Sequence, residues 1–387
     1  MTPAPHALYV HIPFCTTKCT YCAFNTYTHL ESLIPAFVDA LVRELEMVAS
    51  AQPMTPLATV FFGGGTPSLL SIDQHARLLN TIRTWFDLAG DAEISIETNP
   101  NDLDLPYLVG LRREGYNRLS IGMQSANERE LRLFARRHDH TVVTRIWPLI
   151  RQAGFDNVNL DLIYGSPYQT LDSWRHTLDE TLRFAPEHVS LYALGLEDGT
   201  PLKDWVDTGS VPRPDDDLAA DMYDLATEML DHAGYQQYEI SNWCRPGYEC
   251  RHNLQYWRNL PYIGVGPGAH GYAGGLRYAT ELSPQRYVRL LQETVTAQFP
   301  LTPAITESTA VDQQDEIADT LMMGLRLTRE GISLDTFAAR FGVSLLDLHG
   351  DVITKHVSAG LLHVNETRVV LTERGRFLSN VVLRDLI

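Results

Sequence analysis

The chain has 387 residues, of which 44% are hydrophobic and 20% are charged, so its composition excludes disordered and collagen-like classes. This length fits one large domain with a smaller one, or two medium domains. The 48 acidic residues outnumber the 31 basic residues and give a net charge of −17. Such a charge disfavours binding to a nucleic-acid backbone, so we expect no nucleic-acid partner.

The sequence carries no signal for a membrane span or for export. It has no run of 18 apolar residues, so we expect no transmembrane helix, and any membrane contact would be peripheral. Its first residues lack the basic and apolar regions of a signal peptide. Five cysteines, three of them within residues 15–22, do not form a disulfide framework. We therefore expect a reducing compartment, the cytoplasm.

The first half of the chain alternates strand-like and helix-like segments. Strands are expected at residues 8–12, 59–62, 93–97, 118–122, 157–162 and 188–194. Apolar residues recur at every third or fourth position in 31–49, which predicts a helix, and Ser71 is expected to cap a helix that reaches about residue 86. The spacing of the strands suits βα units and a parallel sheet. Six such units predict an α/β fold, a partial (β/α)6 barrel rather than a closed barrel of eight units.

The second half follows a different pattern. A helix is expected at 216–233, a Gly-rich aromatic stretch at 253–275, and a domain boundary at 300–306. Helices are then expected at 313–327, 333–341 and 345–359, followed by a hairpin that turns at 365–367, which is the order of a winged helix. From residue 306 onward 12 acidic residues face 8 basic ones, so a DNA-binding role is not expected. We divide the chain into a barrel (1–240), a connecting segment (241–305) and a winged-helix-like α+β domain (306–387).

Three cysteines give the sharpest chemical signal in the sequence. Cys15, Cys19 and Cys22 form a C-x₃-C-x₂-C pattern in a loop after the first strand. Thiolates bind iron–sulfur clusters and zinc, and structural zinc sites usually use two spaced pairs of ligands. Three close cysteines suit a [4Fe–4S] cluster with one iron left free to bind a substrate or cofactor. Phe24 stands where a fourth cysteine could be.

Polar residues stand at the ends of three successive strands. Glu97, Gln124 and Asp161 end the third, fourth and fifth expected strands. Each alone could be a cap or a loop hydrogen bond, but the carboxyl ends of parallel strands converge on one mouth, where such folds bind ligands. The glycines of residues 63–67, after the second strand, allow a ligand to approach the backbone closely. We therefore expect one ligand site at this edge.

The chain resembles radical S-adenosylmethionine (SAM) enzymes, and more narrowly the oxygen-independent coproporphyrinogen III dehydrogenase family. Three features carry the resemblance: the cysteine pattern with Tyr21, the segment from Tyr9 to Phe14, and Gly63-Gly64-Gly65-Thr66-Pro67. The resemblance covers nearly the whole chain. In that family the open iron chelates SAM, and an electron from the cluster cleaves it. The resemblance implies that Cys15, Cys19 and Cys22 bind the cluster. It implies SAM contacts at Tyr9, Tyr21, Gly64, Gly65, Thr66, Glu97, Gln124, Arg136, Asp161 and Gly195.

The segment from His252 to Trp257 resembles the HNxxYW segment of one branch of this family, the haem chaperones named HemW. Histidine is a good axial ligand of haem iron, and flat aromatic rings can line a porphyrin face. Taken alone, the segment would more often be a loop that closes the barrel mouth, in which the histidine is merely hydrogen-bonded. The resemblance implies that His252 contacts haem, with Cys250 as the alternative ligand.

Two departures from the dehydrogenase favour the HemW branch: Phe24 replaces its fourth cysteine, and only eight residues precede Tyr9, where the dehydrogenase has an extension. We therefore expect a haem chaperone that holds a [4Fe–4S] cluster, SAM and haem, receives electrons from a flavodoxin or ferredoxin, and passes haem to acceptor haemoproteins. Two alternatives remain open, namely coproporphyrinogen III dehydrogenase and a radical SAM methyltransferase. The sequence does not determine whether SAM is cleaved.

Overall fold

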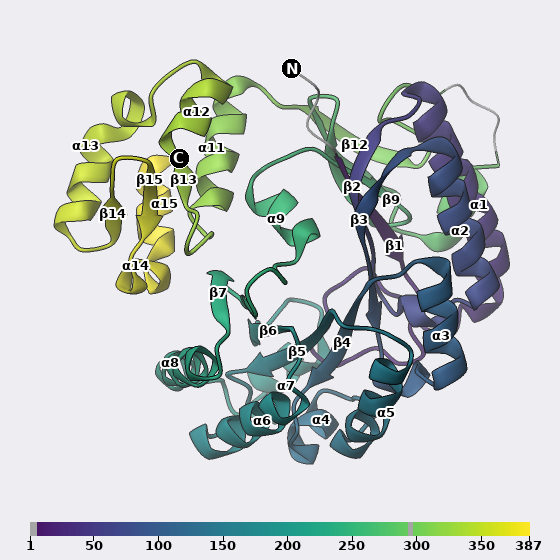
Figure 1. The fold of residues 1–387 in the computed structure, drawn as a ribbon. Helices are drawn as coiled ribbons and strands as arrows, with labels where there is room; N and C mark the ends of the chain where they lie inside the picture. The colour runs from purple at the N-terminus through teal and green to yellow at the C-terminus, as the bar shows by residue number, and fades with distance from the viewer. Residues whose placement is uncertain (1–5, 293–296) are drawn as a thin grey trace.

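A twelve-stranded sheet forms the larger part of the molecule in the computed structural model, which describes residues 6–292 and 297–387 (Figure 1). The strand order is β12-β11-β10-β9-β1-β2-β3-β4-β5-β6-β8-β7. The six strands that come first along the chain are parallel neighbours, which confirms the predicted α/β fold of six βα units. They are β1 (His6–Ile12), β2 (Pro56–Gly64), β3 (Asp87–Thr98), β4 (Arg118–Gln124), β5 (Val158–Tyr164) and β6 (His188–Ala193).

The connections between these strands carry amphipathic helices. The helices are α1 (Ile34–Ala51), α2 (Ile72–Trp85), α3 (Leu105–Glu114), α4 (Glu128–Leu133), α5 (His140–Gln152) and α6 (Leu171–Phe184). In α1, Phe37, Leu41 and Leu45 recur at the helical period and are fully buried in the core shared with the sheet. Ser71 caps α2 as expected, through a reciprocal pair of hydrogen bonds with Gln74. None of the helices in the described residues is long and apolar enough to span a bilayer.

The middle of the chain extends the sheet at both edges, and within residues 241–305 the sequence predicted only a connecting segment. Strands β7 (Gln236–Glu239) and β8 (Asn242–Cys244) continue it beyond β6, while β9 (Tyr262–Val265) lies parallel to β1 and leads to β10 (His270–Ala273), β11 (Leu276–Thr280) and β12 (Ile305–Ala310). These strands are too short, and too often bounded by glycine, to show a clear alternation in the sequence. The helices of this region are α7 (Pro201–Asp207), α8 (Asp216–His232), α9 (Arg251–Trp257) and α10 (Pro284–Leu290).

The C-terminal part has its own core and a three-stranded antiparallel sheet. Helices α11 (Gln313–Gly324), α12 (Leu334–Phe341) and α13 (Leu345–Ser358) and the hairpin of β14 (Leu362–Val364) and β15 (Arg368–Leu371) occur in the predicted order. The sequence reading missed β13 (Ile332–Ser333), α14 (Glu373–Phe377) and α15 (Ser379–Leu386). Because β12 still pairs with β11 of the large sheet, we propose that the last domain boundary lies at residue 311 rather than 306.

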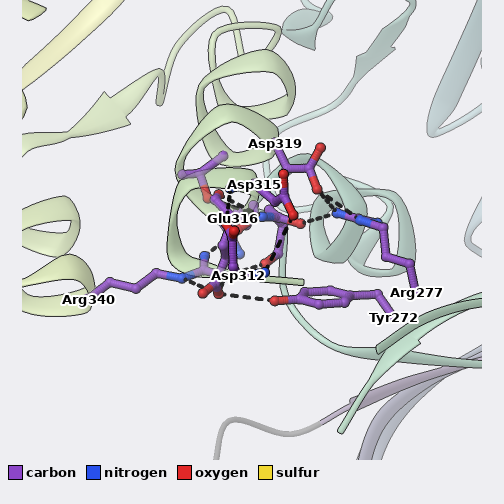
Figure 2. A network of polar contacts seen from close by, with 10 residues as sticks. Tyr272, Arg277, Asp312, Asp315, Glu316, Asp319 and Arg340 are labelled. Atoms are coloured by element: carbon purple, nitrogen blue, oxygen red, sulfur yellow. Dashed lines mark hydrogen bonds and ion pairs between the residues drawn. The ribbon is translucent and has the colours of Figure 1, made fainter. Parts of the chain in front are cut away.

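Polar side chains connect α11 to the edge of the large sheet (Figure 2). Glu316 accepts a hydrogen bond from the Tyr272 hydroxyl at 3.0 Å and another from Arg340 Nε at 3.1 Å. Arg277 Nε donates to Asp319 at 2.8 Å. Strands β10 and β11 therefore hold α11 by charged hydrogen bonds, and the C-terminal domain lies beside α9 (Figure 1).

Candidate cluster and cofactor pocket

A cavity of about 560 Å³ lies where the six parallel strands end. The loop after β1, inward-facing residues of β2 to β6, segments that follow these strands and one residue of α9 form its wall. The cavity is lined by every residue predicted for the site except Tyr9 and His252. Those residues are Cys15, Cys19, Tyr21, Cys22, Gly64, Gly65, Thr66, Glu97, Gln124, Arg136, Asp161 and Gly195.

The three cysteines are free thiols that are partly exposed in this cavity. The Thr66 hydroxyl donates to Cys15 Sγ at 3.4 Å, and Arg136 Nη1 donates to Cys19 Sγ at 3.5 Å. In the described part of the chain, no three His, Cys, Asp or Glu side chains converge on a single metal ion. A four-iron cluster takes each thiolate on a different iron, so three cysteines that line one cavity suit such a cluster.

The glycines after β2 bring the backbone close to the cysteine loop. Gly64 has a φ of +106°, and its N–H donates to Glu97 Oε2 at 3.0 Å. A Cβ atom at Gly65 would lie 2.6 Å from the carbonyl oxygen of Phe14, which is backbone and cannot move away easily. Side chains are therefore excluded at both positions, and backbone groups form this wall of the cavity.

Two half-buried carboxyl groups, those of Glu97 and Asp161, lie in the same cavity. Burial, reinforced by the neighbouring charge of Asp161, raises the pKa of Glu97 to about 7. Burial also raises the pKa of Asp161, although Ser120 Oγ at 2.9 Å and Asn159 Nδ2 at 2.8 Å donate to its carboxylate. A cationic ligand between the two groups would stabilise both as carboxylates, which suits the sulfonium and ammonium groups of SAM.

Arg136, rather than its neighbour Arg137, faces the cavity. Its Nη2 donates to the carbonyl oxygen of Gly122 at 2.7 Å, and its Nε is buried with no hydrogen-bond partner among the described residues. Arg137 instead pairs with Asp102 and does not line the cavity. The choice of Arg136 made from the sequence therefore agrees with the geometry.

Tyr9 lies behind the wall of the cavity. Its hydroxyl shares a hydrogen bond of 3.0 Å with His11 Nδ1, and its ring stacks on Phe61 with 6.3 Å between centroids. Phe61 itself lines the cavity. The structure therefore does not bring Tyr9 to the cavity surface.

His252 is also outside the cavity and is only 1% exposed. Its Nδ1 shares a hydrogen bond with Thr59 Oγ1 at 2.7 Å, and its Nε2 shares one with the Tyr256 hydroxyl at 2.8 Å. Burial, together with the charge of Arg118, lowers the pKa of His252 to about 3. Both ring nitrogens are engaged inside the protein, so this placement does not support His252 as an axial haem ligand.

The alternative ligand, Cys250, is no more accessible to haem. Its side chain is fully buried at the N-cap of α9, where its thiol lies 3.5 Å from Glu93 Oε1. Neither of the two ligands considered from the sequence therefore faces the cavity.

The sequence reading missed several residues of the cavity wall, among them Arg118 and Asn253. A signal for Arg118 was present, because side chains of a strand alternate between its faces with a period of two. Counting back in twos from Gln124 along β4 gives Gly122, Ser120 and Arg118, all of which line the cavity. Asn253 follows the buried His252 on α9, and one step along a helix turns a side chain to another face.

Comparison with known proteins agrees with this geometry. Residues 9–181 match the radical SAM superfamily, and residues 311–378 match the HemN C-terminal domain. A protein of Mycobacterium tuberculosis named heme chaperone HemW is 40% identical over 390 residues, which cover all of this chain and 96% of that protein. The chain belongs to the HemW family of radical SAM proteins. A second HemW, from Bacillus subtilis, is 35% identical over 97% of each chain.

Among solved structures, the Escherichia coli radical SAM enzyme coproporphyrinogen III oxidase (HemN) is similar to this HemW-family chain, with a TM-score of 0.84 and 25% identity. The match covers 99% of this chain and 90% of HemN. The family and fold inferred from the cysteine and glycine motifs are therefore confirmed, and the similarity includes the C-terminal domain.

Proposed function

We propose that this protein is a haem chaperone that holds a [4Fe–4S] cluster and SAM, binds haem, and delivers it to acceptor haemoproteins. The observation that carries the proposal is the 40% identity, over the whole chain, to a protein named heme chaperone HemW. The cavity described above supports it, because thiols, glycines and half-buried carboxyl groups lie together in one place.

The residues present fit both cofactors. Cys15, Cys19 and Cys22 would hold the cluster, and the walls formed by Gly64, Glu97 and Asp161 would hold SAM. When bound, the pair supplies one-electron cleavage of a sulfonium, which no side chain can provide. The protein's own groups balance charge: Arg136 lies beside the thiolate of Cys19, and the two carboxyl groups face the cationic cofactor.

For haem, we propose contact at the mouth of the cavity. Phe24 and Tyr192 both line the cavity, and they are 69% and 44% exposed. Large aromatic side chains with that exposure offer apolar surface to a flat ligand. Phe24 would thus contact haem from the position where the dehydrogenase has its fourth cysteine.

The second candidate is coproporphyrinogen III dehydrogenase, which the similarity to HemN favours. An anaerobic assay with SAM and a reductant, run beside HemN as positive control, separates the two. We expect no protoporphyrinogen IX by chromatography, but about one haem bound per chain and its transfer to an apo-haemoprotein. Steady formation of protoporphyrinogen IX would overturn the chaperone proposal.

We further propose a reducing compartment, the cytoplasm, and a flavodoxin or ferredoxin as electron donor. Five free thiols support the first proposal. The second is supported by the cysteine-lined cavity, since a cluster bound there would need electrons from outside the chain.

A further inference from the structure

A buried arginine faces the floor of the cavity without a partner of its own. Arg118, the first residue of β4, is 2% exposed and yet lines the cavity. Its Nε is buried with no acceptor, and its guanidinium forms no hydrogen bond and no ion pair with any residue that the structure describes. A buried charge without hydrogen bonds is costly, so its retention calls for a ligand group that pairs with it.

The nearest carboxylates do not fill this role, although their charges favour the protonated guanidinium. Glu93 caps α9 and accepts hydrogen bonds from the backbone N–H groups of Arg251 at 3.0 Å and His252 at 3.1 Å. Asp161 accepts from Ser120 and Asn159. Both carboxylates therefore accept hydrogen bonds from other donors, and neither accepts one from Arg118 among the described residues.

A second free donor lines the same cavity. The side-chain amide of Asn253 lines the cavity and has no hydrogen-bond partner among the described residues. The bond between His252 and Thr59 holds this helix against β2, so the backbone position that carries the amide is fixed. A planar guanidinium and an amide N–H₂ together suit the two oxygens of a carboxylate.

We propose that Arg118 and Asn253 form a carboxylate-binding subsite that receives a propionate group of haem. This inference rests on the proposed function. The propionates are the acidic groups of haem, and they extend from the ring on flexible arms. The subsite is distinct from the arginine at the cysteine loop, because Arg136 donates to Cys19 and Gly122. SAM also carries a carboxylate, so the test separates the two sources.

The test compares ligands that differ only in the carboxylate. Haem and its propionate dimethyl ester are titrated by absorption spectroscopy into the cluster-loaded wild type and into Arg118→Met and Asn253→Leu. SAM and decarboxylated SAM are titrated by calorimetry into the same proteins. We expect the wild type to bind haem about ten- to a hundredfold more tightly than the ester, and each variant to lose most of that preference. Arg251→Met, an exposed arginine on the same helix, should keep it.

The outcomes are distinct. If the wild type binds no haem, the proposed function is wrong; if it binds haem and the ester equally, the subsite is wrong and the function stands. If the variants lose discrimination only between SAM and decarboxylated SAM, the assignment to haem is overturned. If Arg118→Met does not fold, the subsite is still tested by Asn253→Leu and by the affinities of the wild type for haem and its dimethyl ester.

Discussion

His252 predicts a measurable pH dependence of stability. Burial holds its pKa at about 3 in the folded protein, against an ordinary value of 6.5. Between these values the unfolded chain binds a proton at this residue and the folded chain does not, so stability falls as the pH falls below 6.5 and continues to fall towards 3. Each pH unit in this range changes the free energy of unfolding by about 1.4 kcal/mol. Between pH 6.5 and pH 5 this residue alone therefore lowers the free energy of unfolding by about 2 kcal/mol.

The substitution His252→Gln tests this reasoning, because glutamine does not titrate but can still bond to Thr59 or Tyr256. At pH 7.5 we expect a loss of about 1–3 kcal/mol in the free energy of unfolding, from the weaker hydrogen bonds and the lost stacking on Phe61. At pH 5 the gap to the wild type should shrink by about 2 kcal/mol. Urea unfolding, monitored by circular dichroism at both pH values, measures the difference in the free energy of unfolding between the two proteins.

Two controls make the result specific. The other buried histidines, such as His75 and His138, are present in both proteins and cancel in the difference. The same substitution at His363, exposed on β14, reports the effect of glutamine on the surface. A gap that is equal at both pH values would refute the buried, neutral histidine. A variant of unchanged stability that loses the Soret band of bound haem would restore His252 as the axial ligand.

Three further predictions concern the cavity. The reconstituted wild type should hold about four iron atoms per chain, and Cys19→Ser should lose most of them. Cys244→Ser, in β8, should keep the iron of the wild type. Full iron content in Cys19→Ser would contradict the cluster assignment. Asp161→Ala should weaken SAM binding about ten- to a hundredfold by calorimetry, and wild-type affinity would remove Asp161 from the SAM site. Gly65→Ala should lower both Tm and iron incorporation, because its Cβ would lie 2.6 Å from Phe14 O, while Gly90→Ala, with no atom within 4 Å, should change neither; equal behaviour of the two would contradict the close backbone approach.

The six parallel strands were predictable because each contains buried apolar residues at a strand-like spacing. Val158, Leu160 and Leu162 of β5, for example, are fully buried, and the helices on either side show a clear helical period. Once the strands are known to be parallel, their carboxyl ends must lie at one edge. Glu97, Gln124 and Asp161 could therefore be placed together from sequence alone, and the structure places all three in one cavity.

Burial of single polar residues was not predictable in the same way. His252 is held by Thr59, which is 193 positions away in the chain, and no local pattern shows that contact. Its residue type suggested an iron ligand, whereas its partners make it part of the interior. Arg118 was not predicted to lie in the site, because a basic residue at the start of a strand is usually exposed to solvent.

The arrangement of α9 gives a physical reason for the spacing in HNxxYW. His252 and Tyr256 are four residues apart, so they lie on one face of the helix and bond to each other. The N-terminus of α9 is held by Glu93 of β3. Just beyond its C-terminus, Asn259 Oδ1 accepts from Arg277 at 2.9 Å and Asn259 O accepts from Arg340 at 2.7 Å.

Helix α9 is thus fixed at one end by the barrel and at the other by residues that also hold α11. The histidine and the tyrosine of the motif serve this fixation, and Asn253 is the motif residue that lines the cavity. A ligand that bonds to Asn253 would therefore contact a rigid element, which lowers the entropy cost of binding. We therefore propose that the histidine of the motif acts on the site by holding the helix that carries Asn253.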